Sequence, residues 1–162
     1  MTISAYLTIL LIGFVAIVQS TVTSHLRLFG VSPDLVLLFV IAWGLLLGTQ
    51  EALFAGLVGG FMLDVLSGAP FGFSILSLTL VSYLAGVSEI NIFRTARLMP
   101  YIVVGLATCV YYCIFLLLLQ LSGHRIMWGP TFLRVVIPAA LLNVLCMPIV
   151  YHLMRWLQGR FG

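Results

Sequence analysis

Apolar residues fill most of this chain in long runs, and short groups of serine, glycine, proline and charged residues separate the runs. A helix that crosses a bilayer needs about 20 mainly apolar residues. By this rule the pattern predicts six helices, at residues 3–23, 33–48, 51–67, 71–89, 100–121 and 131–157. We therefore expect an all-α integral membrane protein with one polytopic domain over residues 1–162.

The second and third segments are shorter than a full span. The stretch 33–48 would extend about 24 Å at 1.5 Å per residue, against the roughly 30 Å of a hydrocarbon core. The two segments fit either a thin hairpin that crosses twice or a re-entrant pair. Either arrangement returns the chain to the same side, so the even number of segments places both termini on one side of the membrane.

The arginines indicate which side that is, because positive residues in short loops favour the cytoplasm. The side that holds the termini carries Arg94, Arg97, Arg155 and Arg160, and the opposite side carries Arg27, Arg125 and Arg134. The larger share lies with the termini. We therefore predict that both termini are cytoplasmic.

Composition excludes several classes of protein. With 63% hydrophobic and 7% charged residues, the chain differs from soluble domains, where about a quarter of the residues are charged. The net charge of +3 is dispersed, so nucleic acid is an improbable partner. The three cysteines lie in apolar runs and the three histidines are scattered, which predicts no disulfide framework and no metal site. Motifs of common catalytic sites are missing from the sequence, so we expect neither an enzyme nor a cofactor. The many apolar aromatic side chains are expected to face membrane lipid.

The most informative acid is Asp64, which ends a glycine-lined apolar helix. A charge deep in a bilayer costs roughly 3 kcal/mol on insertion scales, so such a residue is a functional candidate. A structural role is equally plausible from the sequence: Asp64 caps the following turn or pairs with an arginine. Gly56 and Gly60 precede Asp64 at intervals of four residues, and small residues on one face let another helix approach closely. We expect that helix to belong to this chain rather than to another protein.

The second acid, Asp34, follows Ser32 and Pro33, and this order is typical of a helix start with an N-cap, a first-turn proline and an acid near the positive end of the dipole. By the predicted topology Asp34 and Asp64 share the outer level of the membrane. Arg27 lies on the same side and could pair with either acid. A cation or substrate site is the alternative.

The last predicted helix contains Pro138 and Pro148, each of which removes a backbone hydrogen bond, so kinks are expected there. Asn143 lies between the two prolines in an apolar run. An amide at such depth needs a partner, and we expect it to bond a neighbouring helix or backbone freed by Pro148.

Three motifs together resemble one known family. They are the Ser32-Pro33-Asp34-Leu-Val-Leu-Leu start, the pattern of Gly56, Gly60, Asp64, Ser67, Gly68, Pro70 and Gly72, and the run Tyr83-Leu-Ala-Gly86. This combination resembles the rod shape-determining membrane protein MreD family. The resemblance implies that these residues serve architecture or partner binding rather than catalysis.

The resemblance also implies a setting. It predicts a subunit of the bacterial inner membrane that binds the bitopic protein MreC and supports lateral peptidoglycan synthesis in the elongasome. The other expected members are actin-like MreB, a RodA-type polymerase and a class B penicillin-binding transpeptidase. At the level of a six-helix core, the family is similar to the substrate-binding subunits of energy-coupling-factor transporters. A vitamin-type transporter subunit is therefore the alternative function.

Overall fold

The computed structural model describes residues 2–25, 30–92 and 97–161, and nearly all of them are helical. The helices are α1 (Thr2–His25), α2 (Leu35–Leu47), α3 (Thr49–Ser67), α4 (Phe73–Ile92), α5 (Met99–Leu121), α6 (Trp128–Thr131) and α7 (Ile137–Phe161). A π-helical segment, Phe132–Val136, joins α6 to α7 without a break. The described ranges contain no β-strand, so the all-α prediction is confirmed.

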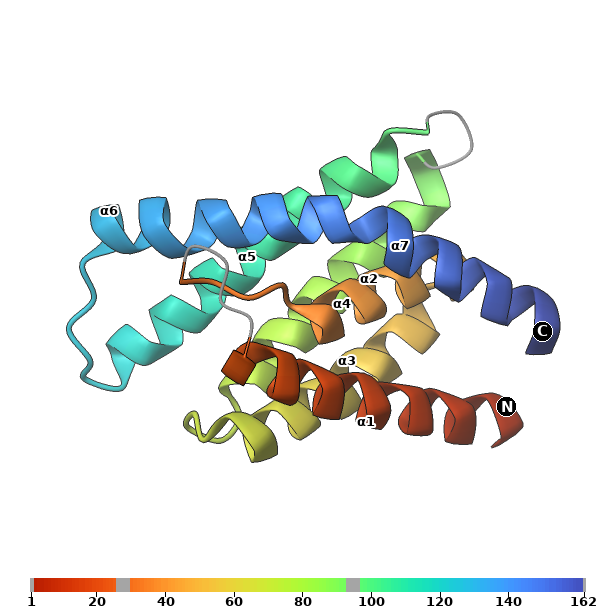
Figure 1. Cartoon of the computed structure of the whole chain (residues 1–162), viewed down its shortest axis with the longest axis horizontal. Helices are drawn as coiled ribbons and strands as arrows, with labels where there is room; N and C mark the ends of the chain where they lie inside the picture. Colours follow the sequence, from red (N-terminus) through yellow and green to blue (C-terminus); the bar gives the residue numbers. More distant parts are fainter. Residues whose placement is uncertain (1, 26–29, 93–96, 162) are drawn as a thin grey trace.

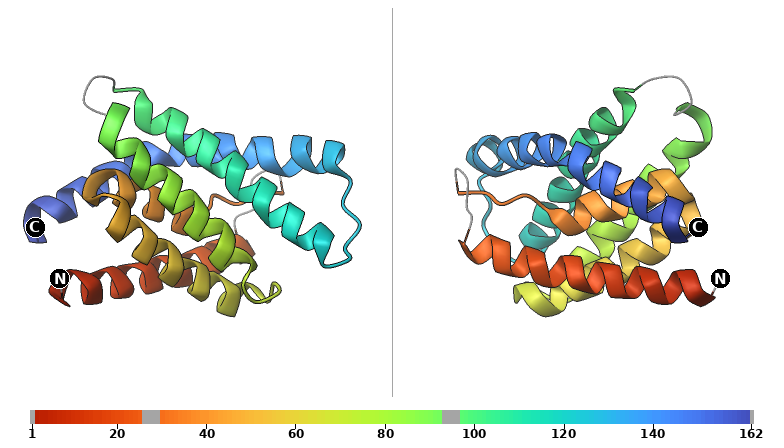
Figure 2. Two further views of the ribbon diagram at one scale, coloured as in Figure 1. Left: turned by 180° about the vertical axis from the view of Figure 1, so that it is seen from behind. Right: turned by 45° about the vertical axis from the view of Figure 1, so that its right-hand side comes forward.

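Successive helices run back and forth through one bundle, with α6 and α7 forming a single final pass (Figure 1). The beginning of α1 and the end of α7 lie at the same end of the bundle in Figures 1 and 2. This end also holds the beginning of α5 (Figure 1).

Four helical stretches are long and apolar enough to cross a membrane: Ala5–Val22, Thr49–Ser67, Met99–Leu121 and Trp128–Arg160. Two further apolar stretches, Leu35–Leu47 and Phe73–Ser88, are shorter. The third helix is longer than the sequence predicted, because it begins at Thr49 rather than residue 51. The structure thus fits a multi-pass membrane protein, and six spans remain a prediction.

The short helix α2 occupies the centre of the bundle (Figure 2). Every residue from Val36 to Leu45 is buried, and α2 contacts α1, α3, α4, α5 and α7. A helix that is apolar on all sides is expected inside a bundle. Because the other helices surround α2, its 13 residues do not have to match the thickness of the bilayer.

The structure corrects the predicted start of α2. The helix begins at Leu35, so Pro33 precedes it instead of forming its first turn, and Asp34 rather than Ser32 is the N-cap residue. The Asp34 side chain makes no capping bond to the helix. Similarly, α4 begins at Phe73 and not at residue 71, because Gly72 has a φ of 101° and is not helical.

The glycines of α3 bring its backbone close to α4. A Cβ atom placed on Gly60 would lie 2.5 Å from the Cα atom of Ile75, and one placed on Gly56 would overlap the Ser82 side chain. Ile75 and Ser82 belong to α4. The small residues therefore face another helix of this chain, and they permit a backbone approach that a methyl group would prevent.

This contact makes Gly60→Ala a sensitive test of the packing. We expect the free energy of unfolding to fall by about 1–3 kcal/mol, the usual cost of overpacking, because the new methyl group meets backbone atoms that cannot rotate away. Gly13→Ala is the matched control, since a Cβ there has nothing within 4 Å. Unfolding of both variants in mild detergent measures the difference. Equal stability of the two variants would contradict the close packing of α3 and α4.

Candidate functional site

Asp64 holds the turn between α3 and α4. Its Oδ2 atom accepts hydrogen bonds from the backbone N–H groups of Gly72 (2.8 Å) and Ile75 (3.3 Å), and its Oδ1 atom accepts one from that of Ser74 (3.0 Å). The residue is 4% exposed. Backbone N–H groups at the start of a helix have no partner within that helix, and a carboxylate there also interacts favourably with the dipole. Asp64 therefore caps α4 from the preceding helix.

The chain reaches this geometry through two glycines with positive φ. Gly68 ends α3 in the left-handed conformation at φ 65°, and Gly72 has φ 101°. Side chains with a Cβ rarely adopt these values. Around the two glycines, the Ser67 Oγ atom accepts a bond from the Ala69 N–H (3.4 Å), and the Pro70 carbonyl accepts one from the Phe73 N–H (3.4 Å). The resulting turn returns the chain to the Asp64 carboxylate within eight residues.

A second set of polar residues meets at the start of α2. We call Gln19, Asp34, Thr108 and Asn143 the polar junction. From α1, the Gln19 Nε2 atom donates to Asp34 Oδ1 (3.0 Å), and Gln19 Oε1 accepts from the Val36 N–H (2.7 Å). The Gln19 amide thus binds the Asp34 carboxyl group, and it caps α2 where the Asp34 side chain does not.

Asn143 and Thr108 complete the junction from the other side. The Asn143 Oδ1 atom accepts from the Asp34 N–H (2.9 Å), and its Nδ2 atom donates to Thr108 Oγ1 (3.1 Å). The Thr108 hydroxyl in turn donates to the Val104 carbonyl (2.7 Å). The side chains of Asn143 and Thr108 are fully buried. The junction therefore joins α1, α2, α5 and α7 by hydrogen bonds.

The sequence places Asp34 and Asp64 together at the outer level of the membrane, and this stays a prediction. Asp34 and Ser74, whose N–H group bonds Asp64, line one cavity. In the structure, Asp34 bonds Asn143, which lies near the middle of the continuous helix from Trp128 to Phe161. The extended segment before α2 enters the bundle (Figure 1). Irregular backbone at such depth requires protein partners, and Gln19 and Asn143 supply them.

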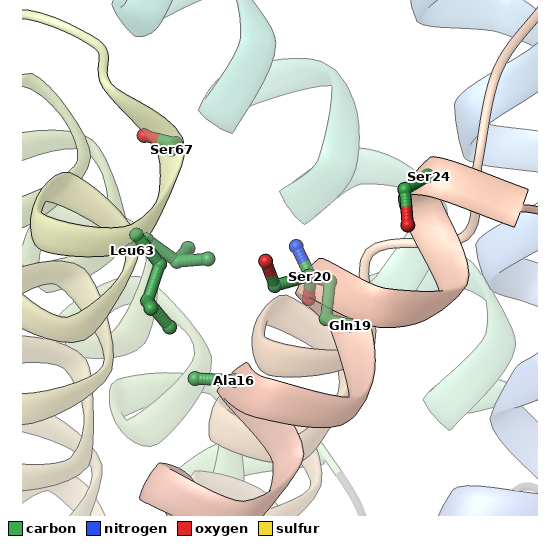
Figure 3. A pocket seen from close by; sticks show the side chains of 7 residues that line it. Ala16, Gln19, Ser20, Ser24, Leu63 and Ser67 are labelled. Carbon is green, nitrogen blue, oxygen red and sulfur yellow. The ribbon is translucent and has the colours of Figure 1, made fainter.

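Two cavities border the junction. One, of about 170 Å³, is lined by polar groups that include Gln19, Asp34, Ser74 and Tyr111. The other is a groove of about 300 Å³ between α1 and the end of α3 (Figure 3). Gln19, Leu63 and Ser67 line both. The outer groove therefore lies directly beside the buried junction.

The remaining predicted residues lie elsewhere. Arg27 falls outside the described residues, so its pairing with either acid stays a prediction. Tyr83 is 48% exposed on α4 and does not take part in the junction. Pro148 lies inside α7, whereas Pro138 follows the π-helical segment at the start of α7. In the described ranges, no group of three or more histidine, cysteine or acidic side chains could hold a metal ion.

Sequence reasoning missed Gln19 and Thr108. Gln19 is a side-chain amide within the mainly apolar helix α1. A polar group in such a run could have been recognised from the sequence. Thr108 was less visible, because threonine often bonds its own helix backbone. Its second bond, to Asn143, depends on how α5 and α7 pack together.

Comparison with known proteins gave one match. The family model described as rod shape-determining protein MreD matches residues 1–157, nearly the whole chain. No curated protein and no solved structure gives a significant match. The similarity to transporter subunits therefore stays a prediction.

Substitutions of Asp64 separate its possible roles. Asp64→Leu leaves three N–H groups without their acceptor, and each unsatisfied buried group costs about 1–3 kcal/mol. We expect a loss of about 3 kcal/mol in the free energy of unfolding. Asp64→Asn keeps one acceptor oxygen and should lose less. If both variants unfold like the wild type but lose cell-shape activity, Asp64 acts through its charge and not as a cap.

A double-mutant cycle tests the polar junction. Asn143→Ala and Thr108→Val should show a coupling of about 0.6–1.7 kcal/mol, the range measured for hydrogen bonds between membrane helices. Asn143→Ala paired with the remote Ser88→Ala should be additive within about 0.5 kcal/mol.

The single substitutions at the junction should also differ. Asp34→Ala removes the acceptor for Gln19 but keeps the backbone bond to Asn143, so we expect a loss of about 1 kcal/mol, typical of one lost side-chain hydrogen bond. Asn143→Ala should cost more, because the buried Asp34 N–H loses its acceptor. Unfolding in the same detergent ranks the variants, and the reverse order would contradict the assigned bonds.

Proposed function

Because the chain belongs to the MreD family of rod shape-determining proteins, we propose that it is a non-catalytic scaffold of the elongasome in the bacterial inner membrane. The family match over residues 1–157 is the observation that carries this proposal. Membership supports a role in rod shape determination. The scaffold role, MreC binding and support of lateral peptidoglycan synthesis are the finer parts of the proposal.

The hydrogen bonding of the buried polar groups supports a scaffold. Asp64 is occupied by three backbone N–H groups, and Asn143 by Asp34 and Thr108. Satisfied buried networks hold helices in one arrangement. A bundle held in this way presents a constant outer surface, which is what a protein needs to position membrane partners.

We further propose that the groove between α1 and α3 receives the transmembrane helix of MreC. Small side chains line its α1 wall, with Ala16, Ser20 and Ser24 at intervals of four residues (Figure 3). Small residues let helix backbones approach in a membrane, where no hydrophobic force drives association. Ser20 and Ser24 are exposed in the described structure, so a second helix can reach them.

The proposed assembly contains MreC, with MreB, a RodA-type polymerase and a class B penicillin-binding transpeptidase. The shared end of α1 and α7 would face the cytoplasm. The family match favours this assignment over the alternative of a vitamin-type transporter subunit, which would require a ligand site and ATPase partners.

Affinity purification of the tagged chain from native membranes tests both functions. In mild detergent, mass spectrometry would identify the proteins and small molecules that are recovered with it. We expect MreC together with the polymerase and its transpeptidase. ATPase subunits with a stoichiometric vitamin would instead establish the transporter function.

Substitution in the groove tests whether it binds the transmembrane helix of MreC. Ser20→Leu should fill the α1 wall, reduce recovery of MreC at least tenfold and cause loss of rod shape. Thr21→Leu is the control, because Thr21 is exposed on the same helix but does not line the groove. Normal recovery of MreC with Ser20→Leu would place the MreC helix on another face. Both variants should unfold at the wild-type temperature.

A further inference from the structure

A second cavity lies at the end of the bundle that holds the end of α7 and the beginning of α5. Its volume is about 330 Å³, and its lining includes Arg97, Tyr101, Tyr151, His152 and Arg155. Arg97 lies two residues before the start of α5, and Tyr151, His152 and Arg155 lie on α7. The cavity plays no part in the polar junction or the α1–α3 groove.

The cavity carries positive charge that the described side chains around it do not neutralise. None of the acidic side chains in the described structure lines it. Within the described ranges, the guanidinium groups of Arg97 and Arg155 form no hydrogen bond and no ion pair. Further along α7, the Arg160 guanidinium lies 5.1 Å from the centre of the Trp156 ring. Two free guanidinium groups around one cavity form a site for a phosphate, which they can bind with paired N–H bonds.

The surrounding surface identifies the source of the phosphate. Apolar side chains next to the lining residues are strongly exposed, among them Ile102 (55%), Ile149 (72%) and Leu153 (50%). In a membrane these surfaces meet acyl chains. Tyrosine and tryptophan at the ends of spanning helices mark the headgroup level, and Tyr101, Tyr151 and Trp156 lie here.

We propose that this cavity binds the phosphate headgroup of an anionic glycerophospholipid, whose acyl chains lie along the exposed apolar faces of α5 and α7. Basic pockets between spanning helices recognise such headgroups. Pro148 lines the cavity. A proline inside a helix lacks an N–H group and bends the helix, which accounts for a cavity between α7 and α5 at this level. The proposal is independent of the scaffold function.

The test uses the purified full-length chain in a neutral phosphatidylcholine detergent mixture. Titration with phosphatidylglycerol should raise the unfolding temperature in a saturable way, and native mass spectrometry should find phosphatidylglycerol retained over phosphatidylcholine. The Arg97→Gln/Arg155→Gln double variant should lose at least tenfold in apparent affinity. Both arginines are exposed, so the variant should unfold like the wild type in phosphatidylcholine alone.

A matched control removes the same charge elsewhere. Arg125→Gln/Arg134→Gln neutralises two exposed arginines toward the other end of the bundle, with Arg134 about 30 Å from Arg155 along one continuous helix. This variant should bind phosphatidylglycerol like the wild type. An equal loss in both double variants would overturn the proposal, because it would indicate attraction to the whole protein charge.

Soluble phosphates distinguish a lipid headgroup from a free phosphate as the ligand of the cavity. Inorganic phosphate and glycerol phosphate should give no comparable stabilisation at the same concentrations, since they lack acyl chains. If they stabilise the wild type as well as the lipid does, and the Arg97→Gln/Arg155→Gln variant loses that effect, the cavity is a soluble-anion site and the lipid assignment is wrong. Equal retention of phosphatidylglycerol and phosphatidylcholine by the wild type would also overturn it.

Discussion

The structure depends on one constraint: a backbone N–H group in an apolar medium must find an acceptor, and the first turn of a helix has none of its own. Two helices of this bundle receive an acceptor for their first turn from a different helix. Asp64 of α3 serves α4, and Gln19 of α1 serves α2. The few polar residues of an apolar chain are therefore placed where helices begin, and they fix the order in which helices pack.

The position of α2 follows from the same constraint. Its residues are apolar on every side, so it is most stable at the centre, where it contacts five other helices. A central helix of 13 residues cannot reach both faces of the membrane, so extended backbone must enter the bundle to meet it. The extended backbone has N–H groups that need acceptors, and Asn143 accepts the hydrogen bond of the Asp34 N–H group. Burial of α2 and the polar junction are thus two consequences of one arrangement.

The sequence predicted the helices well because apolar runs and glycine or proline breaks are local signals. It also identified Asp64, Asp34 and Asn143, since a polar group in an apolar run is conspicuous. It did not identify the hydrogen-bond partners of Asp34. Asp34 looked like the cap of its own helix, yet its side chain bonds Gln19 across 15 residues and its backbone bonds Asn143 across 109. Such pairings depend on which helices become neighbours, and no local pattern specifies that.

Gln19 connects the interior of the protein to the surface proposed for a partner. Its amide is bonded to Asp34 and Val36 at the start of α2, while its side chain also lines the groove between α1 and α3. Among the described elements, α1 contacts only α2 and α3, so fewer contacts restrain it than restrain the central helices. A helix seated in the groove would press α1 against α3 and hold Gln19 at its two bonds. Binding at the surface would then stabilise the start of α2, because one side chain belongs to both sites.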